Sequence, residues 1–268
     1  MSDRPIIRVQ HVVKSFGTVT AVDDISLEVR PGEIFAFLGP NGAGKTTTIK
    51  MLTTLLRPTS GSLELDGLDP VTHPTEVRKR IGVVFQDPSL DSELTAWENL
   101  DIHGVLYHVP RQVRRTRSEA LLKLFELWDR RTDLVKKFSG GMKRRLEIAR
   151  GLLHTPKVLF LDEPTLGLDP QSRNQLWTHV KNLRADEGVT VFLTTHYMDE
   201  ADRVADRIAV IDHGRIVATG STAELKSQTG TDSLEAAFLA LTGTTIRDES
   251  ATAVDQMRQF VRVVRGGR

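Results

Sequence analysis

Hydrophobic and polar positions along the chain predict strands that alternate with helices. Apolar and polar residues alternate from Ile7 to Val13 and again from Ile25 to Val29, the period of half-buried strands. The run Ile34–Leu38 is apolar at every position, as in a strand that is buried on both faces. These patterns predict a small half-exposed sheet, followed by the first strand of a buried sheet.

The rest of the chain continues this alternation. We expect helices at about 45–56, over most of 92–128, and from Gly140 to about Leu153, where Pro156 follows. Strands are expected at 81–85, 158–161, 189–193 and 207–211, with helices near 171–184 and 197–204 between the later ones. Alternating strands and helices predict an α/β fold, a parallel sheet with helices on both faces.

Composition narrows the class of protein. Of 268 residues, 39% are hydrophobic and 26% charged, which is typical of a globular chain. The absence of cysteine excludes a disulfide scaffold, a thiolate metal site and a cysteine nucleophile. A net charge of +1 gives no strong field toward nucleic acid or anionic lipid. The sequence offers neither a long apolar span nor a secretory signal, so we expect a cytoplasmic protein that reaches a membrane only through another chain.

A glycine-rich segment predicts a phosphate site. It matches the pattern G-x-x-x-x-G-K-[ST] without a mismatch through the residues Gly39, Pro40, Asn41, Gly42, Ala43, Gly44, Lys45 and Thr46. Glycines let main-chain N–H groups wrap around phosphate oxygens, and the following helix presents its positive end to the same anion. Lys45 can reach the β- and γ-phosphates, and the Thr46 hydroxyl can ligate Mg²⁺. The alternative is a glycine turn that merely precedes a helix.

The expected strand at 158–161 ends in two carboxylates. Asp162 is placed to support Mg²⁺, as acidic residues at such strand ends do in phosphate-loop enzymes. Glu163, one residue further, points elsewhere and is placed to act as a general base on an attacking water. A solvated acidic pair that caps the strand is the alternative.

Further segments accompany the glycine-rich loop and the acidic strand end. Gln86 follows an expected strand, Asp169 follows the acidic pair, and His196 follows two threonines. Phe138-Ser139-Gly140-Gly141-Met142 opens a helix shortly before the acidic strand. Their order and spacing, over roughly residues 5–225, resemble the nucleotide-binding subunit of ABC transporters. The resemblance implies a P-loop NTPase (RecA-like) core with an N-terminal antiparallel β subdomain and an inserted helical subdomain.

The resemblance also implies a role for each matching position, with ATP and Mg²⁺ as cofactors. The catalytic set it implies is Lys45, Gln86, Glu163 and His196, and the metal set is Thr46, Gln86 and Asp162. By the same resemblance, His196 matches the switch histidine that touches the γ-phosphate, and Gln86 matches the glutamine that also senses the membrane partner. The nucleotide-binding set consists of residues 39–46 together with Thr47, Phe16, Ser139, Gly140, Gly141 and Asp169. Phe16 is placed to stack on adenine, and its alternative is an ordinary core phenylalanine.

One departure from the family pattern refines the resemblance. The common signature begins with Leu and ends with Gln, where this chain has Phe138 and Met142. Because Ser139, Gly140 and Gly141 are intact, we expect ATPase activity to be retained. These features, together with residues 163–170 and 234–243, resemble the drug-resistance (DrrA-like) exporter branch. The resemblance implies efflux of a drug-like, lipid-like or other hydrophobic compound through a separate membrane permease.

The chain holds one set of these motifs, so we expect a homodimer or a dimer with a similar chain. In the family two cassettes bind head to tail, with the phosphate loop of one facing the Ser-Gly-Gly of the other. We expect the permease contact in Asp87–Leu106, at the cytoplasmic face of the membrane. The expected domains are an ATPase at 1–225, with its helical subdomain at about 88–150, and an extension at 226–268 that is helical and then partly disordered.

Two other functions stay open. A soluble ABC ATPase that acts on nucleic acid or ribosomes is disfavoured by the near-zero net charge and by the absence of sustained heptads between Lys45 and Ser139. An inactive regulatory module is disfavoured because Lys45, Asp162, Glu163 and His196 are all present.

Overall fold

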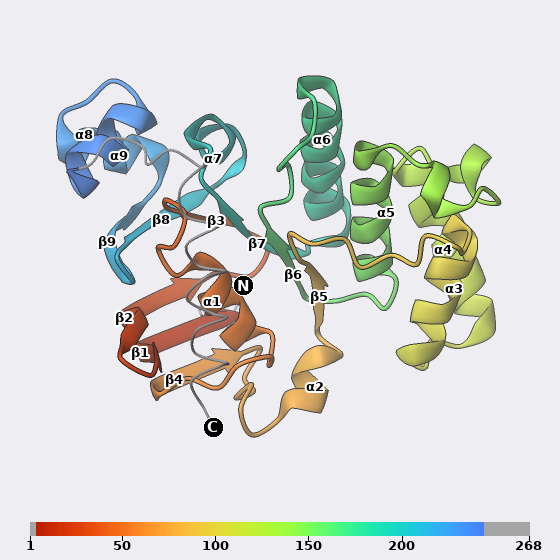
Figure 1. The fold of residues 1–268 in the computed structure, drawn as a ribbon, viewed down its shortest axis with the longest axis horizontal. Coiled ribbons are helices and arrows are strands. Elements are labelled where there is room, and N and C mark those ends of the chain that lie inside the picture. The colour runs from red at the N-terminus through yellow and green to blue at the C-terminus, as the bar shows by residue number, and fades with distance from the viewer. Residues whose placement is uncertain (1–3, 244–268) are drawn as a thin grey trace, which may run out of the picture.

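The computed structural model describes residues 4–243, which form two sheets with helices packed around them (Figure 1). The smaller sheet is antiparallel and has the order β2-β1-β4, with strands β1 (Ile7–Phe16), β2 (Val19–Val29) and β4 (Ser60–Leu65). The larger sheet has the order β5-β6-β7-β3-β8-β9. Its strands are β3 (Ile34–Leu38), β5 (Ile81–Val84), β6 (Val158–Asp162), β7 (Thr190–Thr195), β8 (Arg207–Asp212) and β9 (Arg215–Gly220).

Helices connect the strands and form a separate group at one end of the molecule (Figure 1). The helices of the core are α1 (Lys45–Leu52), α2 (Pro74–Arg78), α5 (Gly140–Leu152), α6 (Pro170–Glu187) and α7 (Met198–Val204). The group at the end holds α3 (Ala96–Leu106) and α4 (Arg111–Leu124), followed by the 3₁₀ turns η1 (Trp128–Arg130) and η2 (Val135–Lys137). The last two helices are α8 (Thr222–Thr229) and α9 (Leu234–Thr242).

The position of β3 in the middle of the larger sheet explains why its sequence is apolar throughout. Ile34, Ala36 and Leu38 belong to the hydrophobic cluster that packs α5 and α6 on one face of the larger sheet. Phe35 and Phe37 belong to the cluster on the other face, which contains α1 and the inner side of the small sheet. The prediction of a strand buried on both faces is confirmed, because every side chain of β3 is buried.

Strand register brings three carboxyl ends to one edge of the larger sheet. Strands β3, β7 and β6 are parallel neighbours, and Leu38 pairs with Thr195 while Asp162 pairs with Thr194. The glycine-rich loop leaves β3 at this edge and enters α1. Ligands of open α/β sheets bind at the carboxyl ends of the strands, so this edge is where a site is expected.

Strand β1, helix α1 and strand β9 differ from what the sequence pattern predicts. The alternation predicted from Ile7 to Val13 breaks at His11, which has a φ of +49° at a register shift, so that Val12 is buried. Helix α1 ends at Leu52, four residues before the expected end. Strand β9 was not expected from the sequence; it pairs antiparallel with β8 and makes the larger sheet mixed.

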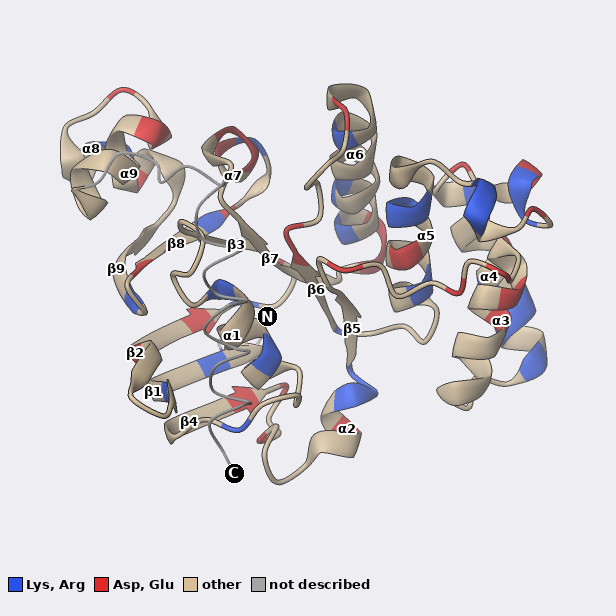
Figure 2. Cartoon of the chain, in the orientation of Figure 1, with Lys and Arg blue, Asp and Glu red and all other residues tan. Residues whose placement is uncertain are grey.

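The helical group carries many basic residues, coloured blue around α4 in Figure 2. Two of them hold the group in place. The Arg114 guanidinium pairs with Asp101 of α3, and the Arg117 guanidinium donates to the carbonyls of Leu152 and Leu153 at the end of α5. Arg117 therefore fixes the helical group to the end of α5, while Arg114 ties α4 to α3 within the group.

The C-terminal part agrees with the expected helix at 234–243. Helix α9 buries Leu234, Ala237 and Phe238 and contacts α7, α8 and β9. The expectation of partial disorder near the end of the chain concerns residues that lie outside those described. Among the described residues, none of the helices has the length and apolar character needed to cross a bilayer.

Candidate functional site

The loop between β3 and α1 is shaped by close main-chain approaches. A side chain on Gly39 would collide with the carbonyl of Ile211, and one on Gly44 would lie 2.6 Å from the Ala21 carbonyl oxygen. Gly44 also has a φ of +106°, which L side chains rarely adopt. Gly44 caps α1 without a side-chain hydrogen bond, so the first N–H groups of the helix face the loop. Such an arrangement can bind a phosphate anion.

The lysine of the loop is buried and directed inward. Lys45 is 6% exposed, and its Nζ donates to the carbonyl oxygens of Gly39 at 2.7 Å and Pro40 at 3.2 Å. The same Nζ lies 3.0 Å from Oε1 of Glu163, which is also 6% exposed. The structure therefore joins the loop lysine directly to the second carboxylate of the acidic strand end.

The first carboxylate of that strand end faces two hydroxyl groups. Asp162 is 1% exposed, and its Oδ1 accepts from Thr46 Oγ1 at 3.2 Å and from Thr194 Oγ1 at 2.6 Å. Hydroxyl and carboxylate oxygens are ligands that Mg²⁺ prefers, so this donor set fits that ion. Within residues 4–243 there is no group of three His, Cys, Asp or Glu side chains that could hold a metal alone. The protein supplies a partial set, as at sites where substrate phosphates and water complete the coordination.

Glu163 is held by its main chain and by its side chain. Its φ is +47°, an uncommon conformation for a residue other than glycine, and its N–H donates to the carbonyl and the hydroxyl of Thr194. The carboxylate accepts from His196 Nδ1 at 2.9 Å. Burial raises the pKa of Glu163, but the hydrogen bond from His196 and the charge of Lys45 outweigh burial and bring the pKa below its ordinary value. The side chain is therefore ionised at neutral pH.

A second group of the expected residues gathers at the N-termini of α5 and α6. Ser139 caps α5 through Met142 N–H, and Asp169 caps α6 through Ser172 N–H at 2.9 Å. A side chain on Gly141 would lie 2.7 Å from the Ser172 hydroxyl oxygen, so the two helix ends are in contact. Among the described residues, no hydrogen bond or ion pair joins this group to Lys45. The expected residues thus fall into two separate half-sites.

Three expected residues stand apart from both groups. Gln86 is exposed in the segment after β5, and Thr47 is half-buried in the first turn of α1. Phe16 lies at the end of β1 with 48% of its surface exposed and Lys14 Nζ 5.0 Å from its ring centre. The exposure excludes the ordinary core phenylalanine and leaves a ring face for a planar ligand.

Two residues of the site carried no role in the sequence analysis. Thr194 binds both Asp162 and the Glu163 N–H, and its signal was its place at a strand end two residues before His196. Arg144 donates from α5 to the main chain of the acidic strand end. Its signal was weak, since a run of basic residues on a helix is usually solvated.

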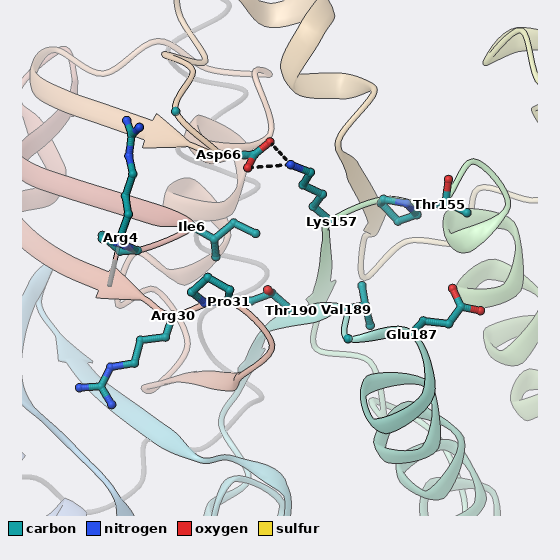
Figure 3. Close-up of a pocket in the computed structure, with 14 residues that line it drawn as sticks. Arg4, Ile6, Arg30, Pro31, Asp66, Thr155, Lys157, Glu187, Val189 and Thr190 are labelled. Atoms are coloured by element: carbon teal, nitrogen blue, oxygen red, sulfur yellow. Dashed lines mark hydrogen bonds and ion pairs between the residues drawn. The ribbon is translucent and has the colours of Figure 1, made fainter. Parts of the chain in front are cut away.

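A pocket away from the candidate site opens on another side of the sheet. It has a volume of about 1110 Å³ and opens at the amino ends of the parallel strands, where Lys157 and Thr190 line it (Figure 3). Lys157 pairs with Asp66 across its wall, at 2.8 Å. Because the phosphate loop and the acidic pair lie at the carboxyl ends, this pocket is not part of the candidate site.

A mostly parallel sheet with a glycine-rich loop, an inward lysine and an acidic strand end defines a P-loop nucleotide-binding protein. The family model described as ABC transporter matches residues 22–166, more than half of the chain. The chain belongs to the ABC transporter family.

Individual relatives refine this assignment. The chain is 47% identical to the daunorubicin/doxorubicin resistance ATP-binding protein DrrA of Streptomyces peucetius, over 96% of this chain and 83% of that protein. It is 45% identical to the Nod factor export ATP-binding protein I of Ralstonia nicotianae, over 82% of this chain and 68% of that one. A solved ATP-binding subunit of an ABC transporter superposes with a TM-score of 0.80 at 29% identity, covering 88% of this chain and 99% of that one.

These relatives confirm the predicted fold class and branch. The chain is an ATP-binding and ATP-hydrolysing subunit of an ABC exporter, similar to the drug-resistance branch. A solved cassette bound to ADP and phosphate, 28% identical with a TM-score of 0.72 over 80% of this chain and 98% of that one, supports nucleotide binding. The relatives favour an exporter over an ATPase that acts on nucleic acid or ribosomes.

Proposed function

We propose that this chain powers efflux of a drug-like, lipid-like or other hydrophobic compound through a separate membrane permease. The chemistry of the cargo rests on the names of the relatives, which are subunits for drug resistance and Nod factor export. The observation that carries the proposal is the cluster of buried Lys45, Asp162 and Glu163 with half-buried His196 beside the phosphate loop. It combines phosphate binding with an ionised carboxylate that can accept a proton.

The first half-site binds the nucleotide. Main-chain N–H groups of the loop and of the first turn of α1 receive the phosphates, Lys45 neutralises them, and Phe16 offers its exposed ring to adenine. Thr46 and Asp162 would hold Mg²⁺, with Gln86 as the further ligand that the resemblance implies, and the ion supplies charge neutralisation at the phosphate oxygens when it is bound. Thr194 fixes Asp162 for this role through its hydroxyl group.

Hydrolysis depends on the second carboxylate. A phosphate group competes with Glu163 for Lys45, because both are anions within reach of the same ammonium group. Once it is released from Lys45, Glu163 is free to accept a proton from the water that attacks the γ-phosphate. His196 holds the carboxylate in place through Oε2, so that Oε1 faces the loop.

The second half-site completes the first in a dimer. Ser139, Gly140 and Gly141 present the positive N-terminus of α5, and Asp169 lies beside them. A head-to-tail pair of chains brings this group to the phosphate loop of the other copy. Support comes from the separation of the two groups within one chain and from a solved relative that is a dimer bound to ADP and phosphate. Hydrolysis removes the γ-phosphate bridge and lets the two copies separate.

The permease contact is proposed on the helical group. Its exposed apolar side chains are those of Ile102, Val105, Leu106 and Val113 on α3 and α4. Exposed apolar side chains that cluster on one surface mark protein interfaces. Three of them lie in or at the end of the segment expected from the sequence, and this contact would hold the chain at the cytoplasmic face of the membrane.

The experiment is Glu163→Gln in the 268-residue chain, with Glu235→Gln on the exposed start of α9 as the matched control. Loss of a general base lowers turnover by about 10²–10⁴-fold. We expect ATP affinity within about threefold of the wild-type value, together with an ATP-dependent dimer in light scattering. ATPase activity near that of the control would exclude Glu163 as the proton acceptor.

A further inference from the structure

A buried guanidinium group links α5 to the acidic strand end. Arg144 is 7% exposed and lies five residues after Ser139. Its Nη2 donates to the carbonyl oxygens of Asp162 at 2.9 Å and Glu163 at 3.2 Å, and its Nε donates to that of Pro164 at 2.8 Å. The main chain that carries both carboxylates is thus held by one side chain.

The same guanidinium reaches a second segment. Its Nη1 donates to the carbonyl oxygen of Phe85 at 2.6 Å, directly before Gln86, and pairs with Glu147 Oε2 at 3.1 Å. Arginine can do this because its planar group carries five donors in fixed directions. Arg144 therefore joins α5, the end of β6 and the end of β5 in one arrangement.

Two neighbours on α5 extend the link along the segment after β5. Glu147 Oε1 accepts from the N–H of Ser89 at 2.8 Å. Arg150 donates to the carbonyl oxygen of Ser89 at 2.6 Å and also contacts its hydroxyl group. The segment from Phe85 to Ser89, which contains Gln86, is thus held to α5 at both of its ends.

The contacts of Arg144 matter more for the placement of the main chain at Asp162 and Glu163 than for the stability of the fold. A buried ion pair such as that of Arg144 and Glu147 can often be replaced by apolar residues with little loss of stability. Glu163 has the uncommon φ of +47°, which persists only where the surroundings fix it. A misplacement of about 1 Å at a catalytic group can lower a rate by about 10²-fold. The donors of Arg144 converge on the carbonyl groups that set this placement.

We propose that Arg144 is a positioning residue, which holds the main chain of Asp162 and Glu163 in register with the segment that carries Gln86 and with the helix that begins at Ser139. The inference rests on the proposed function, in which those residues take part in hydrolysis. A shift of α5 then moves the hydrolytic carboxylates and the segment after β5 together.

The test compares four variants of the 268-residue chain. Arg144→Gln removes the charge and most of the donors, and Arg144→Lys keeps the charge but not the fork. Arg144→Met with Glu147→Met removes the pair without leaving a charge unpartnered. Arg145→Gln is the matched control, because Arg145 lies next along α5 and pairs with Glu126, away from the site.

Four quantities are measured: kcat, KM, the affinity for ATP and hydrogen–deuterium exchange. We expect kcat for ATP to fall by about 10- to 100-fold in Arg144→Gln and in the double variant, with KM and the affinity for ATP within about threefold of wild type. Arg144→Lys should stay at least about fivefold slow, because one ammonium group cannot bind carbonyls on both sides. Hydrogen–deuterium exchange should rise in residues 162–165 of the double variant and in both 85–89 and 162–165 of Arg144→Gln, which keeps the bond of Glu147 to Ser89. Arg145→Gln should match wild type in all four quantities.

The following results would contradict the role proposed for Arg144. A folded double variant with turnover within threefold of wild type, or with unchanged exchange in residues 162–165, would overturn it. A double variant that does not fold would show that Arg144 serves the fold, which also overturns it. If the wild-type chain lacks Mg²⁺-dependent ATPase activity, the proposed function fails, and the exchange measurement still decides the placement by Arg144.

Discussion

The ion pair of Lys45 and Glu163 predicts how the stability of the protein responds to loss of the lysine. The two groups are 3.0 Å apart, and each side chain is 6% exposed. Lys45→Met keeps the length and the apolar stem but leaves the Glu163 carboxylate buried with the hydrogen bond from His196. A buried charge without its partner is costly, so the variant should be less stable without nucleotide.

The structure sets the size of this effect. Breaking a buried pair by removing one partner typically costs about 3–5 kcal/mol. The variant can avoid the unpaired charge by protonating Glu163. From the ordinary pKa of 4.5, protonation at pH 7 costs about 3.4 kcal/mol, and the loss of stability cannot exceed this amount. Since His196 still binds the carboxylate, we expect the free energy of unfolding to fall by about 3 kcal/mol.

Urea unfolding of the nucleotide-free chain at pH 7 measures this change. Glu163→Gln alone should cost about 1 kcal/mol, because Lys45 keeps its bonds to the carbonyls of Gly39 and Pro40. The double variant Lys45→Met with Glu163→Gln should lie within about 1 kcal/mol of wild type, since it leaves no charge unpartnered. A loss below about 1 kcal/mol in Lys45→Met, or simple additivity in the double variant, would refute the reasoning.

Three further predictions concern the helical parts of the molecule. Burial, with Arg150 and His154, lowers the pKa of His103 to about 3 from 6.5, so the unfolded chain binds this proton first as the pH falls. Stability should drop below pH 6.5, and His103→Phe should remove up to about 2 kcal/mol of the loss between pH 7 and 5 in urea melts. The methyl group added by Gly141→Ala would collide with Ser172 and displace the start of α5. In sedimentation experiments ATP-dependent dimerisation should weaken at least about tenfold, while the monomer binds nucleotide as before. Leu106→Glu should reduce co-purification with the permease at least about tenfold and leave ATP affinity unchanged. Unchanged co-purification would show that α3 is not the contact.

Local patterns singled out Lys45, Thr46, Asp162, Glu163 and His196, which the fold brings together, because these residues lie next to the elements that position them. The loop from Gly39 to Thr46 is continuous in sequence, and β6 ends at Asp162, one residue beyond the strand expected at 158–161. The approach of Lys45 to Glu163 then follows from parallel strands that end at one edge.

The missed contacts depend on information that periodicity does not carry. Thr194 meets Asp162 because β6 and β7 are neighbours in a particular register, and strand order is not written in either segment. Arg144 has the sequence signature of a solvated basic helix, and its burial becomes apparent only when α5 packs beside β5 and β6. Strand β9 was missed because Arg215–Gly220 buries only two residues.

Cysteine cross-linking tests the central claim most directly, and the chain offers a clean background because it contains no cysteine. One copy carries Asn41→Cys in the phosphate loop and a second carries Ser139→Cys, both with Glu163→Gln to prevent turnover. The account predicts a disulfide-linked dimer of the two copies with ATP and Mg²⁺, and little with ADP. Cross-linking that is absent with ATP, or equal with ADP, would contradict a nucleotide held between the loop of one copy and the helix end of the other.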